Sequence, residues 1–497
     1  MTDRVRKALK NEDGAILVFW AMCLMMILGI VALSFDLGRY GITRTEYQSF
    51  VDNVAITAAG ELDGASTAIS RATSAAALVA DTHHFGVADK TLSGAADYTL
   101  TFLSALGSAT DGSGDTVTTD PAEAAYVRVT ATPTSVLSTF ASVLAHVTNS
   151  GSLDGSVNAS AVAGFNRYAC DISPMFVCVP NGFKSKDYAG RSILMRSGGG
   201  GSWQAGNFGF LDPALNGYDE AGPCKPKNGN QSVDKDCLIA AVKGVTQCFS
   251  QRKVQVSTGE QTSIASAFNV RFDWYANAGG NASTWINNAD FAPAPHVVTG
   301  LQREANGCLK QNANTASDSV PFPADDCHGA SGTGCTLDTT GRFGDGDWDS
   351  GKEAYFLKNY GVSASAHPNG SLATRYQLYI KEIADRDPSS NKIFPTHQDH
   401  GYKTCTNVAP AGPDRRVLII AAVDCSAGFN GASVNQIGVP VIEFFKVFML
   451  RPVAPLPGTG NEGKFDIYGE VIGPVDAGGT GSNGIGGIIR DMVQLYR

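Results

Sequence analysis

An apolar run near the N-terminus constrains this chain more than any other feature of its sequence. Residues 14–35 carry no charged side chain. A helix of this length, at about 1.5 Å per residue, is long enough to cross the roughly 30 Å hydrocarbon core of a bilayer. Four basic residues precede the run: Arg4, Arg6, Lys7 and Lys10. Because basic flanks favour the cytoplasmic side of a span, we expect residues 1–13 in the cytoplasm and the chain from residue 36 outside the membrane.

A cleaved signal peptide is the alternative interpretation of the same run. Ala32, Leu33 and Ser34 would serve as a small-x-small cleavage site. The apolar core of a signal peptide usually has only about 7–15 residues, however, and this run is longer. We therefore expect an uncleaved, single-pass anchor.

The cysteines indicate the compartment of the outer region. Of 11 cysteines, Cys23 lies in the apolar run and the other ten lie in the outer region. An even number predicts up to five disulfides in an oxidising space such as the bacterial periplasm. The ten are Cys170, Cys178, Cys224, Cys237, Cys248, Cys308, Cys327, Cys335, Cys405 and Cys425.

The spacing of the cysteines excludes few of the possible pairings. Short loops favour the pairs Cys170–Cys178 and Cys327–Cys335. A helix is predicted over residues 233–249, which contain Cys237 and Cys248. If that helix is continuous, these two cysteines lie about 16 Å apart along its axis and cannot pair.

Length and charge bound the remaining possibilities. A chain of 497 residues is too long for one core, so we expect two or three domains outside the membrane. The net charge is −9, and the outer region has no basic cluster. This acidic balance argues against nucleic acid as a partner.

Residues 36–165 predict a long helix over a small antiparallel sheet. An alanine-rich stretch without proline extends the apolar run into a stalk helix. Alternating apolar and polar residues predict two strands, at residues 97–103 and 125–131. A short helix at residues 135–146 and a further strand at residues 156–163 complete this region.

Residues 166–497 have a different amino-acid composition, which is rich in Cys, Trp, Asn and Gly. The continuous apolar run at residues 417–423 predicts a buried strand, and further strands follow at residues 439–451 and 464–472. Polar and glycine-rich stretches predict the loops, at residues 197–202, 313–334 and 452–463.

Four polar residues follow the apolar run in a spaced order: Asp36, Arg39, Gln48 and Asp52. Alanine-rich helix comes next. This order resembles the N-terminal region of TadG-like proteins, which take part in the assembly of bacterial tight-adherence (Flp-type) pili. Later blocks, including residues 170–180, 344–349 and 414–425, look like those of longer TadG-related periplasmic proteins. The resemblance implies a protein that anchors or binds pilus components, with these four residues as candidate partner-binding residues; for Asp36 and Arg39 a plain ion pair within the helix is the alternative.

Many TadG-like proteins carry a von Willebrand factor A domain, whose metal site needs Asp-x-Ser-x-Ser. A hard cation there takes its ligands from oxygen atoms. After Asp171 and Ser173 this chain has Met175 in place of the second serine, and after Asp424 it has Gly428 there. We therefore expect no metal-dependent adhesion site, and we keep a degenerate A-like fold as one option for residues 166–497.

Two other clusters resemble metal sites. They are Asp345, Asp347 and Asp349, and His397, Asp399 and His400. The first resembles the start of a calcium loop, but Ser350 and Phe356 stand where an EF-hand needs Gly and Glu. Asp-Gly turn chemistry explains it as well. For the second cluster we favour a solvated loop over a metal site.

No catalytic signature occurs in the sequence: there is no G-x-S-x-G, no H-E-x-x-H and no phosphate-binding loop. We therefore expect no enzymatic activity and no cofactor. The sequence predicts an α+β protein with a cytoplasmic lead (1–13), a transmembrane helix (14–35), a helix-and-sheet domain (36–165) and a disulfide-rich periplasmic domain (166–497). The expected role is pilus assembly at the inner membrane. The alternatives are a pilus-associated surface adhesin or minor pilin, and an extracytoplasmic hydrolase.

Overall fold

A computed structural model describes most of the chain. The described residues are 13–81, 92–93, 95–109, 112–136, 138, 140, 155–170, 172–197, 203–211, 223–224, 235–242, 248–251, 254–257, 262–276, 285–329, 334–394, 397, 399–425, 436–439, 441–455, 465–475 and 489–497. The chain divides into two compact units, residues 1–166 with 491–497, and residues 167–490. This division falls next to the boundary expected at residue 165, but the last seven residues belong to the first unit, whereas the sequence placed them in the second.

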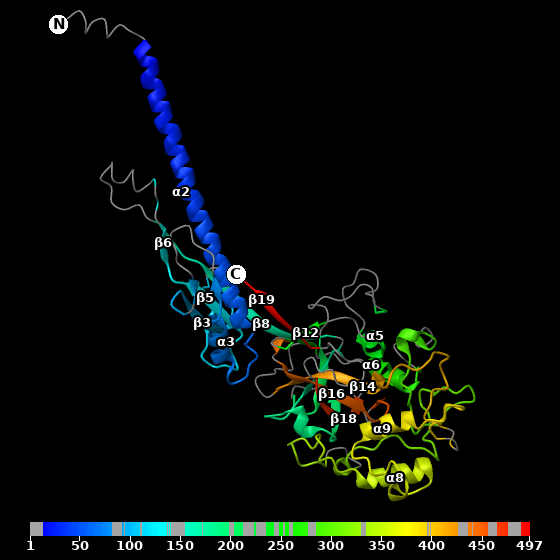
Figure 1. Ribbon diagram of the computed structural model, residues 1–497. Coiled ribbons are helices and arrows are strands. Elements are labelled where there is room, and N and C mark those ends of the chain that lie inside the picture. Colours follow the sequence, from blue (N-terminus) through cyan, green and yellow to red (C-terminus); the bar gives the residue numbers. More distant parts are fainter. Residues whose placement is uncertain are drawn as a thin grey trace, which may run out of the picture. The chain divides into compact units, whose positions relative to one another are not determined.

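Helix α2 (Asp13–Ala59) runs without interruption for 47 residues, from the apolar run into the first unit (Figure 1). Its large apolar side chains are exposed at the start; Leu17 is 75 % and Phe35 is 58 % exposed. Further along, Tyr47 and Val54 are fully buried. Among the described residues, α2 is the helix long and apolar enough to cross a membrane. An apolar surface of this size on one helix is what a bilayer would cover.

The first unit packs α2 and α3 (Ala68–Ala77) on an antiparallel sheet. The sheet takes β8 (Ser160–Cys170), β5 (Tyr126–Ala131), β3 (Tyr98–Ala105) and β4 (Thr116–Val117) in that order. Every second residue of β5 is buried, which confirms the period-two alternation read from the sequence. The strands expected at 97–103 and 125–131 are therefore confirmed, as is the helix over a small antiparallel sheet.

Two short strand pairs complete the first unit. They are β1 (Ala80–Asp81) with β2 (Leu92–Ser93), and β6 (Thr134–Val136) with β7 (Gly155–Val157). The helix predicted at residues 135–146 is wrong at its start, because residues 135–136 belong to β6; most of the remainder lies outside the described residues. The strand predicted at residues 156–163 is divided between β7 and β8.

The C-terminal strand β19 (Ile489–Leu495) pairs with β8. Beyond it, the backbone N–H of Tyr496 donates to the Val162 carbonyl at 2.8 Å. The guanidinium of Arg497 binds the Asp115 carboxylate, which also binds Arg128. These contacts place the end of the chain in the first unit.

In the second unit, six strands form a closed ring. Their order is β10 (Ser192–Ser197), β18 (Phe465–Pro474), β16 (Val441–Met449), β14 (Val417–Val423), β9 (Met175–Cys178) and β11 (Asn207–Leu211). The ring closes because β11 pairs in parallel with β10 through Arg196–Asn207 and Ser197–Phe208. Strand β11 also pairs with β13 (Val254–Ser257), which pairs with β15 (Gln436–Val439). The strands predicted at 417–423, 439–451 and 464–472 are confirmed as β14, β16 and β18.

Most described strand pairs in this ring are antiparallel, and the parallel ones are β9–β14 and β10–β11. A von Willebrand factor A-like fold, expected as one option, is therefore not confirmed. Two further short strands accompany the ring: β17 (Ala454–Pro455) pairs with β18, and β12 (Cys248–Ser250) pairs with the end of β8. The second unit thus mixes sheet and helix, as the α+β prediction required.

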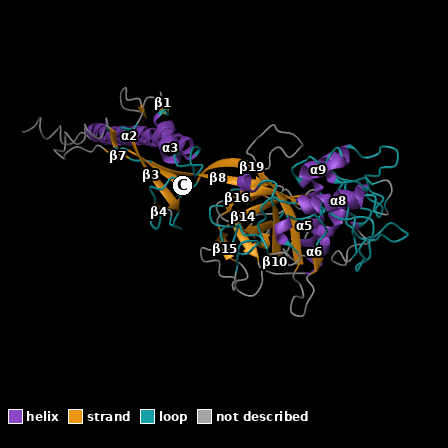
Figure 2. Ribbon diagram, turned by 90° about the horizontal axis from the view of Figure 1, so that it is seen from below, coloured by secondary structure: helices purple, strands orange, loops and turns teal. Residues whose placement is uncertain are grey.

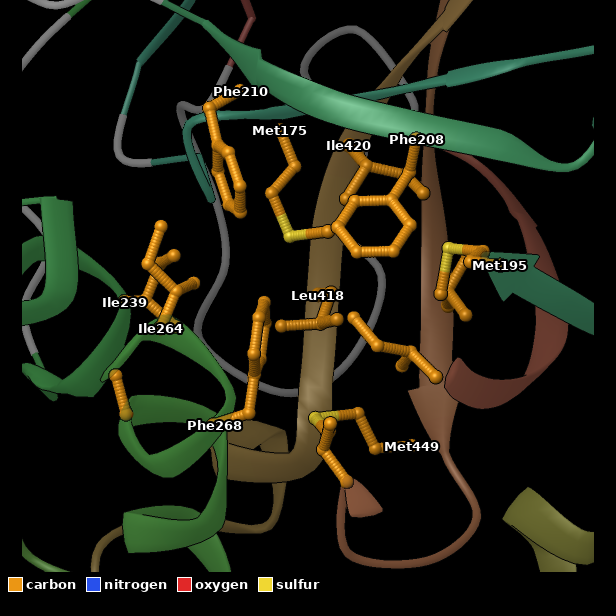
Figure 3. Close-up of a cluster of buried hydrophobic side chains, with 14 of the residues drawn as sticks. Met175, Met195, Phe208, Phe210, Ile239, Ile264, Phe268, Leu418, Ile420 and Met449 are labelled. Atoms are coloured by element: carbon orange, nitrogen blue, oxygen red, sulfur yellow. The ribbon is translucent and has the colours of Figure 1, made fainter. Parts of the chain in front are cut away.

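The described helices of the second unit are short. They include α5 (Lys235–Ala240), α6 (Thr262–Asn269), α8 (Asp349–Tyr360) and α9 (Arg375–Ala384). The 3₁₀ turns among the described residues of this unit are η1 (Ser185–Tyr188), η3 (Val270–Phe272), η4 (Ala289–Phe291), η5 (Asp326–His328), η6 (Ala364–Ala366) and η7 (Pro413–Arg416). Ile239 of α5 and Phe268 of α6 lie opposite Leu418 of β14 (Figure 3). Helices α8 and α9 lie side by side among loops (Figure 2) and share a second core around Phe448.

All ten cysteines of the outer region are paired, and Cys23 is free. The pairs are Cys170–Cys248, Cys178–Cys425, Cys224–Cys237, Cys308–Cys405 and Cys327–Cys335. The five-disulfide framework and the Cys327–Cys335 pair are confirmed.

Two expectations around the cysteines are wrong. Cys170 does not pair with Cys178, because the antiparallel register of β8 and β12 sets Cys170 opposite Cys248. Cys178 instead lies beside Val423 in the parallel pair β9–β14, two residues before Cys425. The helix predicted over residues 233–249 is wrong at its C-terminal end, because α5 ends at Ala240 and Cys248 lies in strand β12.

Candidate functional site

The four residues expected to bind a partner all lie on α2. Gln48 Nε2 donates to Asp52 Oδ1 at 2.8 Å and to the Ser160 carbonyl at 3.1 Å. These bonds connect α2 to the first residue of β8. The structure therefore gives Gln48 and Asp52 a role inside the first unit.

Asp36 and Arg39 lie one turn apart, next to the exposed apolar half of α2. The Asp36 carboxylate accepts a hydrogen bond from the Phe140 backbone N–H at 3.1 Å. The ring of Phe140 meets Phe35 edge-on, with 5.7 Å between centroids. Both Asp36 and Arg39 are half-buried. They mark the end of the apolar half of the helix.

The alternating aspartates form consecutive turns. Asp345 Oδ1 accepts from the Asp347 N–H, and Asp347 Oδ1 accepts from the Asp349 N–H, each at 3.1 Å. Trp348 is buried, and its Nε1 donates to the Ala373 carbonyl at 3.0 Å. This arrangement agrees with the Asp-Gly turn. Over the described part of the chain, no group of three His, Cys, Asp or Glu side chains is placed to hold a metal ion.

The second cluster does not converge on one point. Asp399 is buried and accepts from the Thr299 N–H at 2.9 Å. His400 Nδ1 lies 3.1 Å from the Phe394 carbonyl, and His397 Nδ1 lies 3.6 Å from Asp318. Each side chain thus meets a different partner.

The positions compared with the A-domain metal site also have other roles. Met175 is fully buried on β9, and the Ser173 N–H donates to the Ile419 carbonyl at 3.0 Å. Asp424 follows β14 and is half-buried. Asp171 and Gly428 lie outside the described residues.

Sequence reasoning missed a set of buried arginines in the second unit. They are Arg271, Arg375, Arg415 and Arg416, each at most 6 % exposed. Arg375 binds the carboxylates of Asp325 and Glu470. Arg416 lies within 5.3 Å of the centroids of four aromatic rings and donates to the Met449 and Leu450 carbonyls. The adjacent pair Arg415-Arg416 directly before a continuous apolar strand was the available signal, but arginine is ordinarily an exposed residue.

A buried carboxylate centres a second missed network. Glu382 accepts from His296 Nε2 at 2.7 Å, from the Tyr360 hydroxyl at 2.7 Å and from the Tyr355 hydroxyl at 3.0 Å. His296 Nδ1 accepts from the Val298 N–H at 3.4 Å, so Nε2 carries the proton of a neutral ring. Burial lowers the pKa of His296, which favours this neutral form. Because Glu382, His296 and Tyr355 are at most 1 % exposed, the network acts as a structural one.

Two cavities lie at opposite ends of β14. One, of about 400 Å³, is lined by Trp203, Asn181, Thr339 and Asp424, beside the Cys178–Cys425 disulfide. The other, of about 290 Å³, is lined by Arg271 and Arg415. The second cavity combines charge with an apolar wall.

Comparisons with protein-family models, with curated proteins and with solved structures found no match. Function therefore has to be argued from the residues and their arrangement.

Proposed function

We propose that this chain is a single-pass protein of the bacterial inner membrane, with residues 1–13 in the cytoplasm, the apolar half of α2 in the membrane and the chain from residue 36 in the periplasm. We propose that it serves tight-adherence pilus assembly by anchoring or binding pilus components, without catalysis. One observation carries the proposal: a single helix, α2, has an exposed apolar half followed by a half buried in the first unit. The order of polar residues on that helix resembles TadG-like proteins.

The disulfides and the charges support this placement. Five disulfides need an oxidising compartment, which the periplasm provides and the cytoplasm does not. The basic residues before α2 favour retention of the N-terminus in the cytoplasm. At about 1.5 Å per residue, the 47 residues of α2 extend about 70 Å, enough to cross the bilayer and still pack on the first unit.

The contact with pilus components is assigned to the membrane-proximal end of the first unit. Asp36 and Arg39 lie where the exposed apolar half ends. Ionisable side chains beside a span commonly pair with groups on a neighbouring subunit. Gln48 and Asp52 position the helix on the sheet, and so set the direction in which Asp36 and Arg39 point.

A topology experiment tests the anchor. A reporter active only in the periplasm, fused after Arg497, should be active, and mass spectrometry of the intact protein should find residues 1–34 still attached. A mature protein beginning at residue 35 would contradict the anchor.

Surface pilus counts test the role in assembly. The double variant Asp36→Ala, Arg39→Ala should stay in the membrane at normal level but assemble few pili. Asn53→Ala, an exposed polar position on the same helix, is the matched control and should assemble pili normally. Normal piliation in the double variant would remove these two residues from the proposed contact, and normal piliation without the chain would refute the function.

A minor pilin is the second candidate, and the same helix supports it. In a filament, the uncharged half of α2 would be covered by copies of other subunits instead of lipid. Mechanical shearing separates the two candidates. A minor pilin should appear in sheared surface fibres, whereas an assembly protein should stay with the inner membrane.

A further inference from the structure

Two buried arginines line the cavity of about 290 Å³ at the start of β14. Arg271 lies in η3 and is 6 % exposed; Arg415 lies in η7 and is 4 % exposed. The rest of the lining is largely apolar and includes Leu238, Val242 and Ile419. The polar groups that also line the cavity are Ser173 and Asp414.

The hydrogen bonds of the two guanidiniums all go to backbone carbonyls. Arg271 donates to the carbonyls of Arg415 at 2.7 Å and Ile239 at 2.8 Å. Arg415 donates to the carbonyls of Ala292, Ala241 and Ala240. A guanidinium has five N–H donors, so about half of the donors of this pair are used. Within the described residues, Arg271 Nε is buried and has no partner.

The described chain balances the positive charge of the pair only in part, because Asp414 lines the cavity but makes no ion pair with either arginine. Arg375, elsewhere in the same unit, is neutralised by Asp325 and Glu470. No described carboxylate makes an ion pair with Arg271 or Arg415. The C-terminal carbonyls of the short helix α5 supply at most about half a negative charge. Burial lowers the pKa of Arg271 to about 10, so it remains charged at neutral pH.

Uncompensated buried charge is costly, and an anion in the adjoining cavity would remove that cost. The walls restrict which anion fits. Asp414 lines the same cavity, where its carboxylate would repel a multiply charged ion such as phosphate. The apolar wall would contact a hydrocarbon group. A ligand with one negative charge and a short apolar tail would match both the arginines and the apolar residues of the cavity.

We propose that this cavity binds a small amphipathic monocarboxylate, with its head group between Arg271 and Arg415 and its tail against Leu238, Val242 and Ile419. The proposal does not depend on the role in pilus assembly. It assigns the second unit a ligand site for a small organic acid.

Thermal unfolding of the full chain in detergent, followed by tryptophan fluorescence, tests the site. Pentanoate is the probe, pentanamide is its uncharged analogue, and phosphate is the inorganic anion, all at one ionic strength. A ligand that binds the folded state raises the melting temperature in a saturable way. Pentanoate should do so, whereas pentanamide and phosphate should have at least tenfold weaker effects. Equal shifts with pentanamide, a shift with phosphate alone, or no shift with pentanoate would overturn the assignment.

A cavity-blocking variant keeps the test independent of folding. Gly412 lines the cavity, its φ is −66°, and a Cβ added there meets open space. Gly412→Phe should therefore fold normally and lose the pentanoate shift. Gly41→Phe is the matched control, because a Cβ at Gly41 on α2 also meets open space. A full pentanoate shift in Gly412→Phe would show that pentanoate binds elsewhere and would refute the site.

Discussion

The first unit holds its sheet against one long helix, whereas the second unit folds around a ring of strands joined by long irregular connections. The core of the first unit consists mainly of alanine, valine and aromatic side chains on α2, α3 and the sheet, without a cysteine. All ten paired cysteines belong to the second unit. Regular packing of helices on a sheet thus stabilises the first unit, and disulfides stabilise the second. Disulfides are needed there because its irregular connections cannot bury a continuous apolar face.

Buried charges support the irregular connections in the same way. Asp273 accepts from the N–H groups of Thr404 at 2.7 Å, Cys405 at 2.8 Å and Thr406 at 3.2 Å. Arg416 supplies donors to two carbonyls at the end of β16. A buried backbone group needs a partner, and where no strand or helix provides one, these side chains do. The comparison predicts that the second unit depends on its cross-links and buried polar groups far more than the first.

Removal of the longest cross-link should have the largest effect. Cys178–Cys425 joins residues 247 apart in sequence, and Cys327–Cys335 joins residues 8 apart. Loop entropy predicts losses in the free energy of unfolding of about 5.5 and about 2.5 kcal/mol, respectively. The double alanine variants of each pair can be compared by urea unfolding, since four of the five tryptophans lie in the second unit. Hydrogen exchange of the β5 amides in the first unit should stay unchanged. An equal loss of stability in both units would contradict the conclusion that the disulfides stabilise the second unit alone.

Truncation of the buried carboxylate of Glu382 should cause the second-largest loss of stability. Glu382→Ala leaves the donors of His296, Tyr355 and Tyr360 without their acceptor. Each buried donor left unsatisfied costs about 1–3 kcal/mol, so the three together predict a loss of about 3 kcal/mol or more in the free energy of unfolding. Glu304→Ala is the matched control, because its ion pair with Lys310 is exposed and should contribute less than about 1 kcal/mol. Similar urea midpoints for the two variants would mean that the network does not stabilise the second unit.

Lowering the pH should destabilise the second unit by a smaller amount. Burial, the largest cause, holds the folded-state pKa of His296 below its ordinary 6.5, against the opposing effects of Glu382 and Asp399. The unfolded state therefore binds the proton more tightly, so this stability is present above pH 6.5 and is lost as the pH falls below it. One such group predicts a loss of at most about 1 kcal/mol between pH 6.5 and 5.5. The urea midpoint should follow this trend in the wild type and flatten in His296→Gln; an opposite slope would show that the folded ring is charged.

The same contrast explains which parts of the fold could be predicted from sequence. The exposed half of α2, the alternation of β5 and the apolar run of β14 depend on local patterns, and each was predicted. Cys327–Cys335 was predicted because its loop is short. The pairing of Cys170 with Cys248 depends on the register of two strands far apart in sequence, which no local pattern specifies.

The burial of the arginines and the closure of the ring could not be predicted from sequence either, because both depend on residues that are far apart in the chain. Arg271 and Arg415 meet only because η3 and η7 come together around the end of α5. The apolar strand that follows Arg415 was the one available signal, and it is weak because arginine is ordinarily exposed. The sequence predicted Gln48 and Asp52 as partner-binding residues, and that role stays a prediction. It could not foresee that Gln48 bonds to Ser160, more than a hundred residues away.

Gln48→Ala should have the smallest effect, and it tests the first unit. The substitution removes the bonds from Nε2 to Asp52 and to the Ser160 carbonyl, at a half-buried position. A hydrogen bond of this kind contributes about 1 kcal/mol net, so hydrogen exchange of the β8 and β5 amides should report a loss of that size. Asn53→Ala, exposed on the same helix, should cause no loss. If Gln48→Ala leaves the exchange of these amides unchanged but reduces the number of surface pili, Gln48 acts on a partner and not on the packing of α2. If both readouts change together, the residue acts through the orientation of α2 on its sheet, as its hydrogen bonds indicate.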